Sequence, residues 1–96
     1  MSDQIYLKNL IKNASSFWDY EELLPVEEKT AKITMGEGNT PLVAAENLGS
    51  QIGIKKLYLK NEGVNPSGTF KDRCMSISFS KAKELGAEAV VIGSAG

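Results

Sequence analysis

The sequence predicts an α/β protein in which N-terminal helices precede a βαβ unit of a parallel sheet. Three observations indicate this fold class. Residues 1–16 carry an amphipathic helical pattern, residues 56–92 suggest strand, loop, helix and strand in that order, and residues 89–92 (AVVI) are wholly apolar. A wholly apolar strand is typical of a parallel sheet that is covered on both faces. The connection between two such strands is expected to be right-handed.

A short amphipathic helix is expected within residues 1–16, ending near residues 13–16. Four apolar residues recur there at the spacing i, i+3, i+4 and i+7: Leu7, Leu10, Ile11 and Ala14. This spacing places them on one helical face. Residues 17–24 are expected to add a helical turn that Pro25 stops, because proline disfavours a helical conformation in the residue before it. Residues 26–32 are charged and are expected to run along the surface.

The middle of the chain alternates loops with short elements. Residues 35–41 contain Gly, Asn and Pro and are expected to form a loop. Residues 44–52 suggest a short helix that Gly53 ends. Residues 56–60 (KLYLK) are a strand candidate, and residues 61–68 (NEGVNPSG) form a loop by composition.

Residues 69–85 are expected to form the main helix, with Gly86 placed to end it. Lys71 lies at its N-terminal end, and on a helical wheel one side with Lys71 is apolar or small: Cys74, Met75, Ser78, Ala82 and Leu85. The opposite side is more polar: Asp72, Arg73, Ser76, Lys83 and Glu84. We therefore predict that the side of Lys71 packs against the protein and that Cys74 is a buried, unreactive thiol.

Two interpretations of Lys71 stay open on position alone. A lysine at a helix end commonly packs its stem and leaves its ammonium in water. Alternatively, a partly desolvated amine loses its proton and attacks an aldehyde to form a Schiff base. The location suits the second interpretation, because ligands of open parallel sheets bind beyond the carboxyl ends of the strands.

The composition excludes several classes of function. The 96 residues carry a net charge of −1 and no basic stripe, so neither nucleic-acid binding nor attraction to an anionic membrane is expected. No histidine and a single cysteine leave no ligand set for a metal such as zinc, no Ser-His or Cys-His pair and no intramolecular disulfide. No apolar run is long enough to cross a membrane, and we expect a reducing, cytoplasmic location.

Four segments resemble one known family. Residues 65–73 (NPSGTFKDR) resemble the cofactor-lysine segment of fold-type II pyridoxal-phosphate enzymes, whose fold is like that of tryptophan synthase β. Residues 36–43 (GEGNTPLV) and 57–62 (LYLKNE) are similar to the upstream loop and strand of that family. Residues 18–25 (WDYEELLP) resemble a segment of the threonine synthases. The similarity covers residues 17–96.

The resemblance implies a role for each matching position. Lys71 would bind pyridoxal 5'-phosphate as a Schiff base and later move protons between cofactor and substrate. Ser94, Ala95 and Gly96 resemble the start of a loop that holds the substrate carboxylate. Asn39 and Thr40 are expected to line the same site, although a turn role for Asn39 is equally open. The phosphate-binding loop and the partner of the pyridine nitrogen would lie beyond Gly96.

The implied activity is that of a lyase of threonine biosynthesis, which converts O-phosphohomoserine and water to threonine and phosphate. Residues 1–96 would then be the N-terminal segment of a larger two-domain enzyme, inactive alone, and a homodimer stays open for the whole protein. Two alternatives also stay open. One is a related enzyme such as cysteate synthase, diaminopropionate ammonia-lyase or threonine dehydratase, and the other is a non-catalytic piece that associates with another chain.

Single residues near the lysine also carry expectations. Asp72 is expected to favour the helix N-terminus through its charge. Arg73 is expected to be a structural ion-pair partner and not a catalyst. Thr69 or Ser67 is expected to cap the helix.

Overall fold

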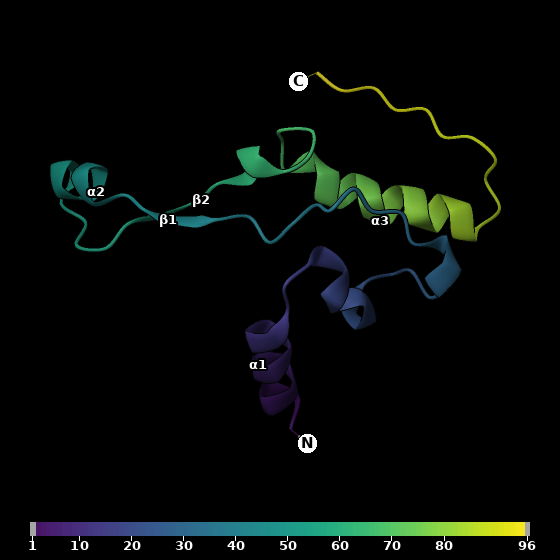
Figure 1. Cartoon of the computed structure of the whole chain (residues 1–96), viewed down its shortest axis with the longest axis horizontal. Coiled ribbons are helices and arrows are strands. Elements are labelled where there is room, and N and C mark those ends of the chain that lie inside the picture. The colour runs from purple at the N-terminus through teal and green to yellow at the C-terminus, as the bar shows by residue number, and fades with distance from the viewer. Residues whose placement is uncertain (1, 96) are drawn as a thin grey trace.

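The computed structural model describes residues 2–95 (Figure 1). Among these residues it contains three α-helices: α1 (Asp3–Asn13), α2 (Glu46–Ile52) and α3 (Lys71–Glu84). Two strands form its sheet: β1 (Leu42–Ala44) and β2 (Tyr58–Lys60). Short 3₁₀ turns complete the element order: η1 (Phe17–Leu23), η2 (Lys29–Ala31) and η3 (Glu62–Val64). No helix within residues 2–95 is long and apolar enough to cross a membrane.

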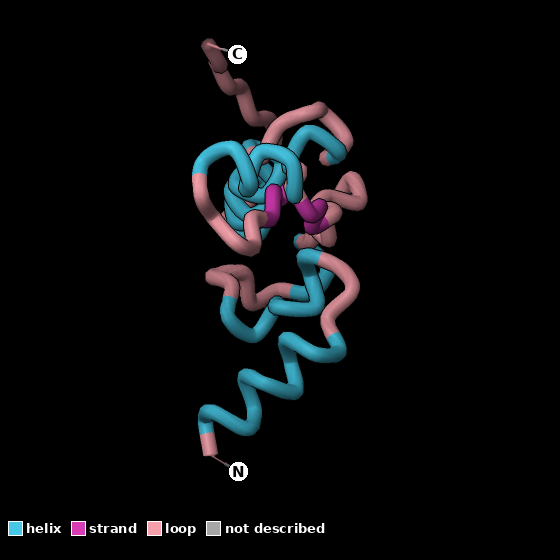
Figure 2. The backbone as a smooth tube through the Cα atoms, turned by 90° about the vertical axis from the view of Figure 1, so that its left-hand side faces the viewer, coloured by secondary structure: helices cyan, strands magenta, loops and turns pink. Residues whose placement is uncertain are grey.

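The helices predicted at the N-terminus are confirmed. The side chain of Ser2 accepts a hydrogen bond from the N–H of Ile5 and caps α1. The apolar stripe of α1 does not pack, since Ile11 is 66% exposed and α1 extends away from the rest of the chain (Figure 2). Its one side-chain hydrogen bond to η1 among the described residues runs from the Tyr6 hydroxyl to the carboxylate of Glu22. η1 ends at Leu23, as Pro25 predicts.

The sheet is an antiparallel hairpin and not the predicted parallel sheet. β1 pairs with β2 in the register Leu42↔Lys60, and α2 lies in the connection between them. α2 is confirmed within the predicted residues 44–52, and Gly53 ends it in a left-handed conformation with φ +77°. β1 was not predicted, because residues 42–44 are too few to show a strand period.

The predicted strand at residues 89–92, and with it the βαβ unit, is wrong for the described chain. These residues follow α3 without regular structure and run back along it (Figure 1). A strand needs a hydrogen-bonded neighbour about 4.8 Å away. The only strand pair among residues 2–95 is β1 with β2, so this apolar segment has no strand to pair with, and Val91 is 95% exposed.

The described chain is flat and has a very small apolar core. Its extents are 51 × 43 × 16 Å and its radius of gyration is 16.9 Å, whereas a compact domain of this length has about 12 Å. Val26 and Ala31 are the buried apolar residues among those described. Both lie in residues 26–32, which were predicted to stay on the surface. Polar contacts must therefore hold much of the chain together.

α3 supplies many of these contacts, and they do not lie on the side that the sequence analysis predicted to pack. Its buried residues recur at a spacing of four: Asp72, Ser76 and Ser80. Three residues of the predicted packed face are exposed instead: Cys74, Ser78 and Leu85. The predicted helix is confirmed over Lys71–Glu84, and Gly86 follows its end with φ +88°. The assignment of its buried side was wrong, and Cys74 is an exposed thiol.

Four residues at this spacing form what we call the polar ridge: Asp72, Ser76, Ser80 and Glu84. Ser76, Ser80 and Glu84 of this ridge bind residues 26–41, a segment we call the strap, which crosses α3 (Figure 1). Glu84 accepts hydrogen bonds from the N–H groups of Glu27 (2.7 Å) and Glu28 (2.6 Å), and Ser80 accepts one from Ile33 (2.8 Å). Backbone N–H groups outside helices and sheets find such acceptors in side chains, and small serines let the strap approach closely.

Candidate active site

Lys71 is the first residue of α3, and the end of the described chain returns to it. The C-terminal segment runs back along α3 (Figure 1), which brings Ser94 beside the lysine. The Nζ of Lys71 donates a hydrogen bond of 2.7 Å to the Oγ of Ser94. The backbone N–H of Lys71 donates to the Oγ1 of Thr69 (3.2 Å), but the predicted cap by Thr69 or Ser67 is wrong, because the N-cap position of α3 is Phe70, without a side-chain cap hydrogen bond.

A cavity of about 480 Å³ opens at this contact. Its walls are largely apolar: Met35, Met75, Phe79 and Ile92. Its polar side chains gather near the start of α3 and the chain end: Ser67, Thr69, Lys71, Asp72 and Ser94. The volume falls within the range of small-molecule sites, which is about 300–1,000 Å³. One primary amine among apolar walls and hydroxyl groups suits a carbonyl ligand that an amine can attack.

The structure brings together some of the predicted site residues. Lys71, Ser94 and Ala95 all line the cavity, whereas Gly96 lies outside the described residues. Asn39 and Thr40 do not line it. Asn39 has a left-handed backbone with φ +47°, as its alternative turn role requires, and Thr40 is buried elsewhere. Their part in substrate binding stays a prediction.

Thr40 belongs to a cluster around Arg73. The Nε and Nη2 of Arg73 donate to the two carboxylate oxygens of Glu62, with 3.0 Å from Nη2 to Oε2. The Thr40 hydroxyl donates to the same carboxylate, and the Nζ of Lys60 donates to the Thr40 carbonyl (2.6 Å). This confirms that Arg73 is an ion-pair partner. The two hydrogen bonds between the Arg73 guanidinium and the Glu62 carboxylate raise the pKa of Arg73. The same bonds, together with the hydrogen bond from Thr40, lower the pKa of Glu62 to about 2.

Two buried side chains that the sequence analysis missed complete the connection between strap and α3. The Nδ2 of Asn65 donates to the carbonyl of Glu62 (3.0 Å), and its Oδ1 accepts from the N–H of Gly38 (2.9 Å). Burial alone would raise the pKa of Glu37, but hydrogen bonds from the Ser76 hydroxyl and the Met35 N–H outweigh it and lower that pKa. Met35 belongs to the strap and forms one wall of the cavity, so these contacts hold that wall in place.

We expect acid to destabilise this cluster. The Glu62 carboxyl has an ordinary pKa of 4.5 and a folded pKa of about 2. Between these values the unfolded chain binds a proton that the folded chain does not, so this contribution is complete above about pH 4.5 and is lost as the pH falls toward 2. The lowered pKa values of Glu37 and Glu84 act in the same direction.

Urea unfolding between about pH 6 and pH 2 measures this effect. The free energy of unfolding should decline across the window. The decline should be shallower in Arg73→Gln, because the guanidinium that lowers the Glu62 pKa is absent. An unchanged decline in that variant would contradict the assignment to Glu62.

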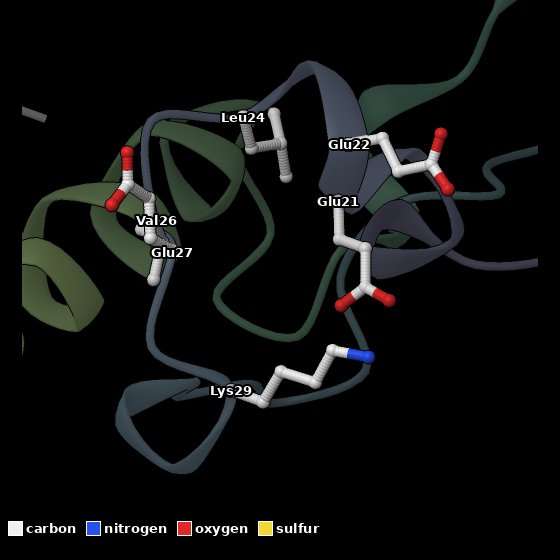
Figure 3. A pocket seen from close by; sticks show the side chains of 6 residues that line it. All are labelled: Glu21, Glu22, Leu24, Val26, Glu27 and Lys29. Carbon is white, nitrogen blue, oxygen red and sulfur yellow. The ribbon is translucent and has the colours of Figure 1, made fainter.

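A second hollow, of about 420 Å³, lies between η1 and the strap (Figure 3). Six residues line it: Glu21, Glu22, Leu24, Val26, Glu27 and Lys29. The side chain of Lys29 points toward Glu21, while Glu22 and Glu27 point away (Figure 3). Its polar groups do not converge, and no group of three or more metal-binding side chains occurs within residues 2–95. The cavity at Lys71 is therefore the better candidate.

Comparison with known proteins shows the family of the chain. The family described as "Pyridoxal-phosphate dependent enzyme" matches residues 33–96. The chain is 43% identical to the threonine synthase of Methanocaldococcus jannaschii over 96 residues, which are all of this chain and 24% of that protein. It is 46% identical to the threonine synthase of Methanosarcina acetivorans over 95 residues, 99% of this chain and 23% of that protein.

A bacterial relative gives the same result over a shorter stretch. The threonine synthase of Halalkalibacterium halodurans is 50% identical over 78 residues, which are 81% of this chain and 22% of that protein. The chain thus spans about a quarter of the length of these curated relatives.

Proposed function

The chain belongs to the family of pyridoxal-phosphate dependent enzymes, and from this premise we propose that Lys71 holds the cofactor in a lyase of the threonine synthase type. The whole protein would convert O-phosphohomoserine and water to threonine and phosphate. Residues 1–96 would form the N-terminal segment of this two-domain, fold-type II enzyme. The observation that carries the proposal is that Lys71 lines a cavity, with its amine 2.7 Å from the Ser94 hydroxyl.

The residues at the cavity fit the cofactor. Pyridoxal phosphate offers an aldehyde, and the cavity presents one primary amine to it, on Lys71. Apolar side chains such as Phe79 and Met75 suit the faces of a flat aromatic ring. Lys71 would hold the cofactor through Nζ. When bound, pyridoxal phosphate supplies an electron sink for negative charge at the substrate carbons.

The side chains of this chain would then position the amine and carry protons. Because Ser94 accepts a hydrogen bond from Lys71, it orients the Nζ within the cavity. The amine can take a proton from a substrate carbon and return it to another, since general acid–base catalysis requires a group within hydrogen-bonding reach. Ser94 and Ala95 lie beside it, where they would meet the substrate carboxylate. The single cysteine agrees with a cytoplasmic location.

Turnover of four amino acids by the whole protein tests the proposal. O-phosphohomoserine, O-phosphoserine, threonine and diaminopropionate are each incubated with the cofactor-loaded protein, and phosphate, threonine and ammonia are measured. We expect one threonine for each phosphate released from O-phosphohomoserine. Turnover of another member of the panel without that reaction would support a related enzyme instead. No turnover of any substrate would favour a non-catalytic role.

A further inference from the structure

Asp72 is a buried carboxylate immediately after the cofactor lysine. It is 3% exposed, which is unusual for an acidic side chain unless hydrogen bonds or charges satisfy it. Its partner is Ser67, whose backbone N–H donates to Oδ2 at 2.8 Å and whose hydroxyl donates to Oδ1. Ser67 and Asp72 both line the cavity. The carboxylate therefore joins the loop before α3 to the first turn of that helix.

The loop that Asp72 holds contacts Lys71 directly. Gly68 has φ +81° and its N–H donates to the carbonyl of Asn65 (2.7 Å), which turns the chain tightly. Thr69 then accepts from the Lys71 N–H. Without the carboxylate, the N–H and the hydroxyl of Ser67 would lose their common acceptor, and the loop would no longer be tied to the first turn of α3.

We propose that Asp72 is a positioning residue for Lys71. Its two bonds to Ser67 fix the loop at residues 65–70 and the first turn of α3 in one arrangement, so that the Nζ of Lys71 faces Ser94 inside the cavity. This goes beyond the charge effect expected from the sequence, since the carboxylate acts through direct hydrogen bonds. The inference rests on the proposed role of Lys71.

Borohydride trapping in the whole protein tests the inference. Pyridoxal phosphate is added, the adduct is reduced at several times, and the modified lysines are mapped by peptide mass spectrometry. Asp72→Ala should slow the trapping at Lys71 by about tenfold, because small misplacements of reacting groups carry large rate penalties. Asp72→Asn should slow it less, since its side-chain oxygen can still accept from the Ser67 N–H.

Ser80→Ala is the matched control. Ser80 belongs to the same polar ridge and is fully buried, but it binds the strap two helical turns from Asp72. Its loss should leave trapping at Lys71 unchanged. Equal slowing by Ser80→Ala and Asp72→Ala would overturn the proposal, because the effect would then reflect general stability.

Hydrogen exchange provides a readout without cofactor. The Ser67 amide should exchange faster in Asp72→Ala than in the parent protein, and Ser67→Ala should add nothing to the trapping defect of Asp72→Ala. If the amide exchanges faster while Lys71 is trapped at the parental rate, Asp72 anchors the loop without positioning the lysine and the inference fails. If the parent protein is not trapped at Lys71, the proposed role of the lysine fails and the inference fails with it.

Discussion

Replacement of Lys71 by alanine in the whole protein is expected to remove the covalently held cofactor and nearly all activity. Among residues 2–95, Lys71 carries the one primary amine that lines the cavity, so no other described side chain there offers the same group. Because Lys71 would both attach the cofactor and transfer protons, turnover should fall by at least about 10³-fold. The visible absorption band of the bound cofactor should disappear, and borohydride should fix no cofactor on α3.

The control for this prediction is another lysine of the same chain. Lys56 is exposed and lies before β2, and Lys56→Ala should retain both the absorption band and the activity. Circular dichroism of both variants establishes that the helices persist. A Lys71→Ala protein that keeps the absorption band and its turnover would remove Lys71 from the cofactor site.

The local elements were predictable because their signals lie within a few residues. The helical spacing of apolar residues predicted α1, and Gly53 and Gly86 predicted where α2 and α3 end. Glycine adopts positive φ without steric penalty, so its position after a helix is informative in any surroundings. Such signals depend on backbone geometry and not on what packs against the element.

The buried side of α3 could not be predicted from such local signals. A helical wheel assumes that apolar residues mark the packed face, but here the packed neighbour is a backbone segment that needs hydrogen-bond acceptors. The polar ridge therefore faces inward while Cys74 and Leu85 stay exposed. A signal for the ridge existed, since Asp72, Ser76, Ser80 and Glu84 recur at every fourth position. The strand predicted at residues 89–92 failed for a related reason, because a strand depends on a partner elsewhere in the chain.

The candidate site was predicted where its residues lie in segments that resemble one family. Lys71 and Ser94 are 23 residues apart and meet in the cavity, as expected from two segments that resemble one family. The partner of Arg73 was not predicted, because Glu62 and Thr40 come from different segments and only the fold brings them together. Local sequence could indicate that Arg73 is paired, but not with which carboxylate.

Gly38→Ala is expected to destabilise the chain more than the same substitution at Gly36, the other glycine of the strap. Gly38 has φ +87°, a conformation that L-residues rarely adopt, and its N–H binds Asn65. An added Cβ would lie 3.0 Å from the Cβ of Phe17 and 3.3 Å from the Nη1 of Arg73. Backbone strain and overpacking together should cost about 2–3 kcal/mol. The Tm should fall by about 8–24 °C in a chain of this size.

Gly36→Ala separates the two causes. Gly36 has nearly the same φ, +84°, but an added Cβ there would meet no atom within 4 Å. This variant should lose only the strain energy, about 1 kcal/mol. Thermal unfolding followed by circular dichroism compares the variants, and Trp18, the single tryptophan, reports locally because its ring lies 5.7 Å from that of Phe17.

The difference in stability loss between Gly38→Ala and Gly36→Ala measures how closely η1, the strap and α3 approach one another. A larger loss for Gly38→Ala, with a shift in Trp18 fluorescence, means that Phe17 and Arg73 cannot yield, because each is fixed by contacts of its own. Equal losses of stability in the two variants would contradict this, because Phe17 and Arg73 would then have moved to make room for the added methyl group. In that case Arg73 would move aside for the added methyl group and keep its ion pair with Glu62. The decline in the free energy of unfolding between about pH 6 and pH 2 should then be the same in Gly38→Ala as in the parent protein.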